Sequence, residues 1–239
     1  MLSLEMYGCI HMMKTRPMPF NMLEELFVAE LRGGITYYIA KGAQERAKQA
    51  LRSAKTADNR MSALSAFVKA CIPENNLLEA IAVTEDLLKD PQMIFHRSRL
   101  LFYIGDLNER LSEFDTAISY YCRSLACASR PEELHHAMWG NLGFCWLYKQ
   151  DFKTAEQCFR WAISINGHSW EAWKNLGVSL EHQQQIEEAF LAYFKAVVLS
   201  RGRAVPVMHL TRLSQRHPGK VPDVSGMRPT VYREYEVIL

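Results

Sequence analysis

Cysteine and histidine are the residues of this sequence with the greatest capacity for chemistry. The six cysteines stand at positions 9, 71, 122, 127, 145 and 158, and no two of them form a Cys-x-x-Cys pair. His135 and His136 are adjacent, so on a helix their side chains point about 100° apart and cannot share one metal ion. No cysteine and histidine cluster has the spacing of zinc ligands. The pattern therefore predicts small buried thiols in a reduced protein and no metal site.

Motifs that would support catalysis are also missing from the sequence. It has no glycine-rich phosphate loop, no His-Glu-x-x-His pair and no Gly-x-Ser-x-Gly turn. Acidic residues are plentiful, but their spacing marks no acid and base pair. Glu187 and Glu188 fit the start of a helix, where negative charge is favourable. We therefore expect a protein that is not an enzyme and needs no cofactor.

The charge distribution does not favour nucleic acid as a partner. The chain has 239 residues, with 28 Lys and Arg against 26 Asp and Glu. Residues 61–200 contain 12 basic and 17 acidic residues, whereas residues 201–239 contain 7 and 3. An acidic middle either steers a basic ligand to the centre or consists of ordinary solvated helix faces. No apolar run approaches the ~20 residues of a membrane-spanning helix, and we expect a cytoplasmic location with no membrane span.

A 34-residue repeat organises the second half of the chain. When residues 136–169 are placed above residues 170–203, Trp139 aligns with Trp173 and Gly143 with Gly177. Further matches are Asn141 with Asn175, Leu142 with Leu176, Ala155 with Ala189, Phe159 with Tyr193 and Ala162 with Ala196. The spacings within each copy predict two helices, each with one apolar stripe. The small residues let the two helices of a hairpin approach closely, and stacked hairpins bury the stripes.

This pattern resembles the tetratricopeptide repeat, known for Trp-x2-Leu-Gly-x2-Tyr followed by Ala-x3-Phe-x2-Ala. Residues 136–169 and 170–203 follow it closely, with Trp146 and Leu180 in the tyrosine position. A third copy covers residues 98–131, and its glycine precedes the next one by 38 residues rather than 34. The resemblance implies an all-α fold: a right-handed superhelical stack of antiparallel helix hairpins, or α-solenoid.

The remaining segments extend this stack in both directions. The positions of Leu64, Phe67, Ala80 and Thr84 predict a degenerate hairpin at 61–97, before the three repeats of 98–203. The other predicted segments are a mobile N-terminal arm at 1–20, a helical extension at 21–60 with helices at 21–31 and 35–55, a capping helix at 204–217 and an extended or disordered tail at 218–239. Because Pro and Gly interrupt the tail, we expect it to be separable from the fold.

In a tetratricopeptide stack the first helix of each hairpin lines the concave face, so the resemblance also implies partner-binding residues. They are Arg99, Phe102, Tyr103, Asp106, Asn141, Phe144, Tyr148, Lys174, Asn175, Val178 and His182, and further inward positions hold Glu109, Arg110, Ala137, Gly140, Leu147, Glu171 and Glu181. Solvated helix faces rarely contain so many apolar side chains, and Asn can pair with a peptide backbone. The carboxylate clamp of chaperone-binding relatives matches only at Asn141, and Asp106 and Glu171 would repel a carboxylate.

Two kinds of function fit these residues. The first is a non-catalytic protein–protein interaction module that binds a peptide or helix segment of a partner, of unknown identity, in the concave groove. The alternative is a self-associating scaffold, a homo-oligomer, or an accessory subunit of a larger complex. In that case the apolar groove residues are core against the capping helix, the N-terminal arm or a second copy.

Overall fold

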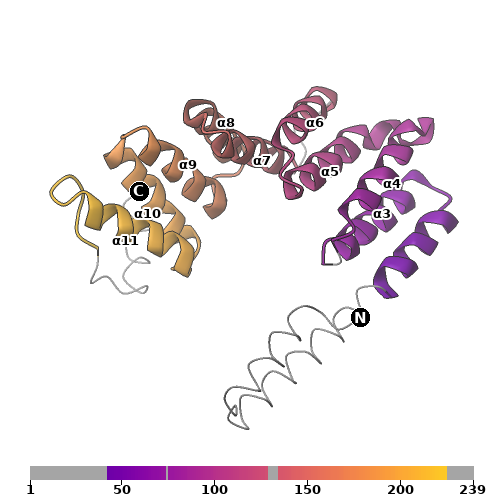
Figure 1. The fold of residues 1–239 in the computed structure, drawn as a ribbon, viewed down its shortest axis with the longest axis horizontal. Coiled ribbons are helices and arrows are strands. Elements are labelled where there is room, and N and C mark those ends of the chain that lie inside the picture. Colours follow the sequence, from indigo (N-terminus) through magenta and orange to yellow (C-terminus); the bar gives the residue numbers. More distant parts are fainter. Residues whose placement is uncertain (1–41, 74, 129–133, 225–239) are drawn as a thin grey trace, which may run out of the picture. The chain divides into compact units, whose positions relative to one another are not determined.

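The structure, a computed structural model, describes residues 42–73, 75–128 and 134–224. The chain divides into two compact units, Met1–Asn76 and Leu77–Leu239, and each is described by itself. Figure 1 colours the described residues along the chain from indigo to yellow. The predicted arm at 1–20, the predicted helix at 21–31 and the end of the tail at 225–239 lie outside the described residues.

The described part of the first unit is helical. Residues 42–53 form a helix within the segment predicted at 35–55, and α3 covers Ala57–Cys71. The Thr56 hydroxyl accepts a hydrogen bond from the Asn59 backbone N–H at 3.3 Å, which satisfies one free donor at the start of α3. The Phe67 side chain is completely buried in this unit. Leu64, three residues earlier, is also completely buried, as the predicted helical spacing requires.

The region predicted as a degenerate hairpin contains two helices. These are α3 and α4, the latter covering Leu77–Lys89. Ala80 and Thr84 are both buried, and the Thr84 hydroxyl donates to the Ala80 carbonyl at 2.7 Å. The two helices belong to different compact units. The packing of 61–97 as one hairpin therefore stays a prediction.

The second unit is a series of helix hairpins. After α4 and the short 3-10 helix η1 (Pro91–His96), the hairpins are α5 (Arg97–Arg110) with α6 (Phe114–Cys127), α7 (His135–Tyr148) with α8 (Phe152–Ile165), and α9 (Trp170–His182) with α10 (Ile186–Leu199). Each hairpin packs against the next in chain order, and α11 (Ala204–Arg216) packs against α10 (Figure 1). The described residues contain no strand, only an isolated bridge between Pro218 and Val221. The fold is the predicted all-α solenoid of hairpins.

One turn geometry closes each of the three hairpins. Ser112, Gln150 and Gln184 have φ angles of 63°, 62° and 62°, in the left-handed region. They are 38 and 34 residues apart, as the repeat requires. In the middle hairpin the Asp151 N–H donates to the Trp146 carbonyl at 3.0 Å, which satisfies one free carbonyl at the end of α7. The predicted register is therefore confirmed by backbone geometry.

A glycine on the first helix of each hairpin faces an aromatic ring on the second helix. A Cβ atom at Gly143 would lie 2.8 Å from the Phe159 ring, too close for any side chain. The matching distances are 2.7 Å from Gly105 to Tyr121 and 2.5 Å from Gly177 to Tyr193. All three rings are completely buried. The two helices therefore meet at the glycine, and the ring fills the space beside that contact.

The C-terminal helix of the second unit agrees with the prediction. α11 covers Ala204–Arg216 within the predicted capping segment at 204–217. Its Leu210 and Leu213 are fully buried in the same core cluster as Tyr193 of α10. An apolar stripe on this helix covers the last hairpin, as terminal helices do in repeat proteins.

The segment that follows α11 corrects the prediction of a separable tail. Val221 and Val224 are only 9% and 2% exposed and belong to the core cluster of the last hairpin. The Ser214 hydroxyl of α11 donates to the Pro222 carbonyl at 2.8 Å. Residues 218–224 are irregular, with a turn at 219–220. They are nevertheless docked, because two apolar side chains cover core surface that α11 leaves open.

Candidate interaction cleft

The first helices of the three hairpins border a cleft of about 390 Å³. α5 contributes Glu109, α7 contributes His136, Ala137, Gly140, Asn141 and Phe144, and α9 contributes Glu171, Ala172 and Asn175, with Phe159 and Ser169 completing the lining. Two carboxylates, two carboxamides and apolar surface therefore meet in one concave site. This composition suits a ligand that has both a polar backbone and side chains.

Two glycines of α7 show how the sequence shapes this cleft. Gly143 lies against the Phe159 ring and closes the hairpin. Gly140, one helical turn earlier, lies on the cleft, and a Cβ atom there would have no other atom within 4 Å. The first glycine is required for packing, whereas the second leaves the cleft open.

Three of the predicted partner-binding residues line the cleft. They are Asn141, Phe144 and Asn175, which come from two successive hairpins. The Asn141 amide donates to the Tyr121 hydroxyl at 3.1 Å, which fixes its carboxamide. The other predicted residues, Arg99, Phe102, Tyr103, Asp106, Tyr148, Lys174, Val178 and His182, do not line this cleft.

The position of Phe102 corrects the predicted site. Its side chain is only 9% exposed and belongs to a core cluster with Tyr121 and Met138. The Phe102 and Tyr121 ring centroids are 5.8 Å apart. The ring packs between α5, α6 and α7 and is not open to a partner. Phe102 is therefore a core residue, because its apolar ring gains more burial there than on the concave face.

Tyr148 lies in an exposed aromatic group beside the cleft. It is 57% exposed, and its ring stacks on Phe114 with centroids 4.7 Å apart. The Phe144 ring lies 4.9 Å from it at an angle of 58°. The cleft residue Phe144 thus continues into an exposed aromatic surface at the end of α7.

The other predicted residues of α5 are engaged at its surface. The Asp106 carboxylate forms an ion pair with Arg110 at 3.0 Å. The Tyr103 ring is half-buried and packs against the core cluster that contains Phe102. Arg99 is half-buried near the start of the helix. These residues surround the face of α5 that carries Glu109 without forming the cleft itself.

Three predicted residues of α9 lie outside the cleft. Burial lowers the pKa of the Lys174 ammonium, and the nearby Glu171 carboxylate acts against this change. Val178 is half-buried against the core cluster of the last hairpin. The exposed His182 ring lies parallel to the Phe152 ring at 4.3 Å. Val178 thus packs against the last hairpin, whereas His182 contacts α8 of the hairpin before it.

Glu109 has the most perturbed electrostatics of the cleft. The Tyr121 hydroxyl donates to its Oε2 atom at 2.8 Å, and the Cys145 thiol lies 3.8 Å from the same oxygen. Burial raises the pKa of the Glu109 carboxyl to about 7, against the lowering effects of the Tyr121 hydrogen bond and of Arg110. The carboxyl is therefore near its midpoint of ionisation at neutral pH.

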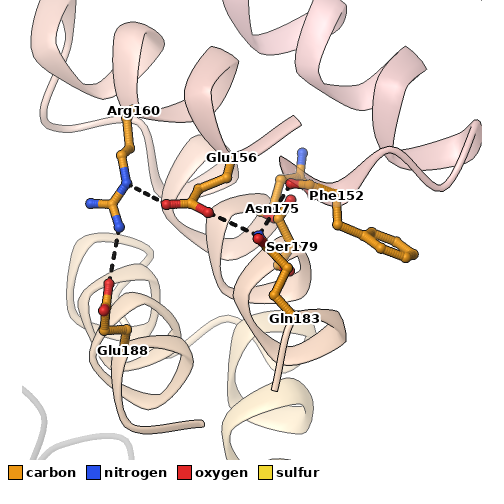
Figure 2. A network of polar contacts seen from close by, with 7 residues as sticks. All are labelled: Phe152, Glu156, Arg160, Asn175, Ser179, Gln183 and Glu188. Carbon is orange, nitrogen blue, oxygen red and sulfur yellow. Dashed lines mark hydrogen bonds and ion pairs between the residues drawn. The ribbon is translucent and has the colours of Figure 1, made fainter. Parts of the chain in front are cut away.

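A polar network holds α8, α9 and α10 together beside the cleft, as Figure 2 shows. The Gln183 amide donates to the Glu156 carboxylate at 2.8 Å and to the Phe152 carbonyl at 3.3 Å. Arg160 joins Glu156 at 2.9 Å and Glu188 at 3.0 Å. The network links α8 and α10, the second helices of two successive hairpins, to the end of α9. It thereby fixes the position of α9, which carries the cleft residue Asn175.

The sequence prediction placed Glu109 and Gly140 on the concave face without naming them as partner-binding residues, and it did not place His136 there. Glu109 is distinguished by a spacing: a glutamate stands twelve residues before a tyrosine at 109 and 121, and again at 181 and 193. The Gly140 signal is its place between two larger concave residues. His136 was considered only as a metal ligand and is not among the inward positions of the repeat.

The prediction of buried thiols is correct for Cys71, Cys145 and Cys158 and wrong for Cys122 and Cys127, which are exposed. The five described cysteines form no disulfide. Burial raises the pKa of Cys158 to about 12 and also raises that of Cys145, so both stay protonated. Among the residues that the structure describes, no three His, Cys, Asp or Glu side chains are grouped to hold a metal ion. No helix in this part of the chain is long and apolar enough to cross a membrane.

The repeat is recognisable in a known family. Residues 147–206, from the end of α7 to the start of α11, match the family model described as tetratricopeptide repeat. The α9–α10 hairpin and the second helix of the hairpin before it therefore match the tetratricopeptide repeat. The contacts of Gly143 with Phe159 and of Gly177 with Tyr193 are thus contacts between the two helices of one tetratricopeptide hairpin.

Proteins with similar sequence or fold include a complex subunit and two solved structures. Over 90 residues the chain is 31% identical to BBSome complex member BBS4 of Xenopus tropicalis, an alignment that covers 38% of this chain and only 17% of that protein. The structure of BtubC from P. vanneervenii is 14% identical with a TM-score of 0.62, and the match covers 77% of this chain and 83% of that one. YrrB, described as a tetratricopeptide protein with an unusual peptide-binding site, is 15% identical with a TM-score of 0.52, over 64% and 76% of the two chains. At these identities the two structures show the fold alone.

Proposed function

We propose that the chain is a non-catalytic protein–protein interaction module whose cleft between α5, α7 and α9 binds a segment of a partner protein. The observation that carries this proposal is the position of the cleft, at which successive repeats present Asn141, Phe144 and Asn175 together. Stacked helix hairpins form extended surfaces on which one peptide or helix contacts several repeats. The peptide-binding site described for YrrB is in keeping with this use of the fold.

The side chains of the cleft have complementary roles towards such a ligand. A carboxamide has two donors and two acceptor lone pairs, so it can pair with an extended backbone without selecting its sequence. Asn141 uses one donor on Tyr121 and is thereby held in one orientation. Phe144 supplies the aromatic area from which interfaces derive much of their affinity. The remaining candidates, Arg99, Tyr103, Asp106, Tyr148, Lys174, Val178 and His182, extend the proposed surface beyond the cleft.

Filling the cleft tests the proposal. Gly140→Leu places a side chain in open space, and removing a glycine from a helix interior stabilises by roughly 0.5–1 kcal/mol. We expect an unchanged or higher melting temperature and at least a tenfold loss of affinity for peptides that the full chain selects from a randomised library. Affinity is measured by calorimetric titration beside a thermal melt.

A matched control keeps this test specific. Ala126→Leu adds a leucine at an exposed position of α6, outside the cleft. This variant should bind the selected peptides as the original chain does. Peptide affinity that survives Gly140→Leu in a fully folded protein would contradict the proposal.

Self-association is a second candidate function. Leu78 of α4 is 72% exposed, and Ile94 and Phe95 of η1 are 57% and 91% exposed. Exposed apolar side chains of this size are typical of contact surfaces. Light scattering over a range of concentrations tests the idea, with Phe95→Ser expected to shift an oligomer towards monomer. A mass that stays monomeric at every concentration would count against it. A role as accessory subunit is in keeping with the partial similarity to BBS4, a member of a complex.

We also propose that the protein acts in the cytoplasm and binds protein rather than nucleic acid. Five cysteines that form no disulfide are in keeping with a reducing compartment. A formal net charge of only +2 gives no general attraction to phosphates. Fractionation of cells with an antibody to the chain tests the location, and recovery in an oxidising compartment would contradict it.

A further inference from the structure

The same tyrosine–glutamate hydrogen bond occurs twice in the second unit. Tyr121 donates to Glu109 at 2.8 Å in the first hairpin, and Tyr193 donates to Glu181 at 2.8 Å in the last. In the middle hairpin the matching positions hold a leucine and a phenylalanine, so the carboxylate and the hydroxyl are lost together. The two pairs are therefore equivalent sites in one repeat, and their surroundings can be compared position by position.

The Glu181 carboxylate is neutralised by arginines of the following helix. Arg212 and Arg216 of α11 lie 3.6 and 3.4 Å from its two oxygens. The neighbouring His209 ring stacks on Tyr193 with centroids 5.2 Å apart. The chain thus covers this tyrosine–glutamate pair with two guanidinium groups and an aromatic ring from one helix.

At the equivalent positions around Glu109 the following helix has no cation. The register places Phe144 of α7 where α11 has Arg212, and Tyr148 where it has Arg216. In the part of the chain that the structure describes, no ion pair includes Glu109, and Arg110 pairs with Asp106 instead. The Tyr121 hydroxyl of α6 and the Cys145 thiol of α7 contact the carboxyl and are neutral, and Asn141 of α7 contacts the Tyr121 hydroxyl. The charges of Asp106 and Arg110 also act on the carboxyl, in opposite directions. Glu109 therefore lacks the positive charge that its equivalent has.

The missing cation has a place to lie, since Glu109 borders the cleft together with Phe144 and Glu171. We propose that the cleft receives an arginine side chain from a partner segment, and that its guanidinium pairs with the Glu109 carboxylate beside the Phe144 ring. The inference rests on the proposed function, because it names the partner chemistry of the same cleft.

Arginine fits this site better than lysine. Its planar guanidinium pairs with a carboxylate through two hydrogen bonds and stacks on aromatic rings, whereas an ammonium is a compact, strongly hydrated charge. The Phe144 ring lines the cleft together with Glu109 and provides the stacking surface. The excess of acidic residues across 61–200 attracts a basic segment to this part of the chain. An aromatic ring and a carboxylate thus offer the guanidinium both kinds of contact.

Peptide selection followed by paired substitutions tests the inference. The full chain is used to select capped twelve-residue peptides from a randomised library, and the best binder is titrated by calorimetry. We expect an arginine at a fixed position, and at least a tenfold loss of affinity when citrulline, its neutral isostere, replaces it. A lysine replacement should lose less than citrulline. Glu109→Gln should cause the same loss for the arginine peptide and little further loss for the citrulline peptide.

Controls separate a charge effect from a folding effect. Glu187→Gln removes a carboxylate from an exposed position of α10, outside the cleft, and should leave the affinity unchanged. Circular dichroism and a thermal melt of Glu109→Gln should show an intact fold. Arginine peptides that bind the chain and Glu109→Gln equally well would overturn the inference.

The remaining outcomes distinguish the inference from the proposed function. The selected peptides could contain no basic residue and still lose affinity for Gly140→Leu. That result would overturn the inferred arginine but support the proposed interaction module. Peptides that bind Gly140→Leu as tightly as the original chain would overturn both the inference and the proposed function. The absence of any binding peptide would do the same. The original chain could also bind no peptide, whereas the variant with both Arg228→Gln and Arg233→Gln binds. That result would show that the chain's own arginines occupy the cleft, and it would overturn the external partner. A dimer that Glu109→Gln dissociates would assign the arginine to a second copy and overturn it as well.

Discussion

The α5–α6 hairpin and the α9–α10 hairpin contain the same tyrosine–glutamate hydrogen bond, but they differ in the helix that covers it. In the last hairpin α11 brings two arginines to Glu181 and completes the end of the solenoid. In the first hairpin α7 brings Asn141 and an aromatic surface, and the carboxylate borders a cleft. The difference shows how one repeat sequence produces both a covered carboxylate and an open cleft when two positions of the next helix change.

The last hairpin depends on the segment after α11, and breaking that segment has the largest expected effect. Val221→Ser combined with Val224→Ser should lower the free energy of unfolding by on the order of 3 kcal/mol, since each buried valine contributes roughly 1.5–3 kcal/mol. Chemical denaturation measures the change. Lys220→Ser, at an exposed position of the same segment, is the control and should be neutral. A double variant as stable as the original chain would show that the segment does not dock in solution.

The comparison assumes that the hairpins are otherwise built alike, and the glycine contacts test this. Gly105→Ala and Gly177→Ala each place a methyl group against a buried tyrosine ring. Each should destabilise by about 1–3 kcal/mol, the range for overpacking, and by similar amounts. Gly140→Ala, where space is open, should not destabilise. Losses that differ widely between the two tyrosine contacts would show that the two hairpins pack differently.

The pH dependence of stability sharpens the contrast between the two carboxylates. The folded-state pKa of Glu109 is about 7, above the ordinary value of 4.5, so the folded state holds this proton more tightly than the unfolded state. Its stabilising contribution is therefore complete below about pH 4.5 and is lost as the pH rises through about 7. Glu109→Gln should remove this loss and make the protein more stable at pH 8 by on the order of 1–2 kcal/mol.

Denaturation curves of the two proteins between pH 4 and pH 8 provide this measurement. The difference in unfolding free energy between Glu109→Gln and the original chain should grow with pH. A difference that stays constant across the range would contradict the raised pKa of Glu109. Because both proteins share every other titrating group, the difference isolates the one carboxyl.

The smallest effect is expected from making the last hairpin resemble the first. Arg212→Gln with Arg216→Gln leaves Glu181, whose side chain is 13% exposed, without its cations. Because both arginines are partly exposed, we expect a loss of about 1 kcal/mol at neutral pH. Adding Glu181→Gln to the same variant should restore most of the loss. A double variant that is not rescued would show that the arginines stabilise by packing rather than by charge.

Much of the fold was predictable from the sequence because the 34-residue spacing constrains geometry. Two helices of fixed length that meet at Gly143 leave room for one ring, so the register also placed Asn141, Phe144 and Asn175 on one face. The same rule failed for Phe102, because a ring at the edge of the concave face can turn into the core beside Tyr121. Helical spacing gives the direction of a Cβ atom, not the rotamer that burial selects.

The docked segment and the role of Glu109 were beyond such spacing arguments. Val221 and Val224 stand in an irregular segment, where no periodicity distinguishes a docked side chain from a solvated one. The electrostatic character of the Glu109 carboxyl results from its burial and from the hydrogen bond that Tyr121 of α6 donates to it. Both are properties of the packed hairpin. Only the recurrence of glutamate and tyrosine twelve residues apart was visible in the sequence.

Each hairpin of the second unit packs mainly against its immediate neighbours along the chain. A linear array of this kind opens from its ends, because a terminal repeat has one interface to lose and an inner repeat has two. Backbone amides of α7, α8 and α9 should therefore be the last to exchange their hydrogens with solvent. Most of the cleft residues stand on α7 and α9. A ligand would meet a surface that is already formed, with little ordering entropy to lose on binding.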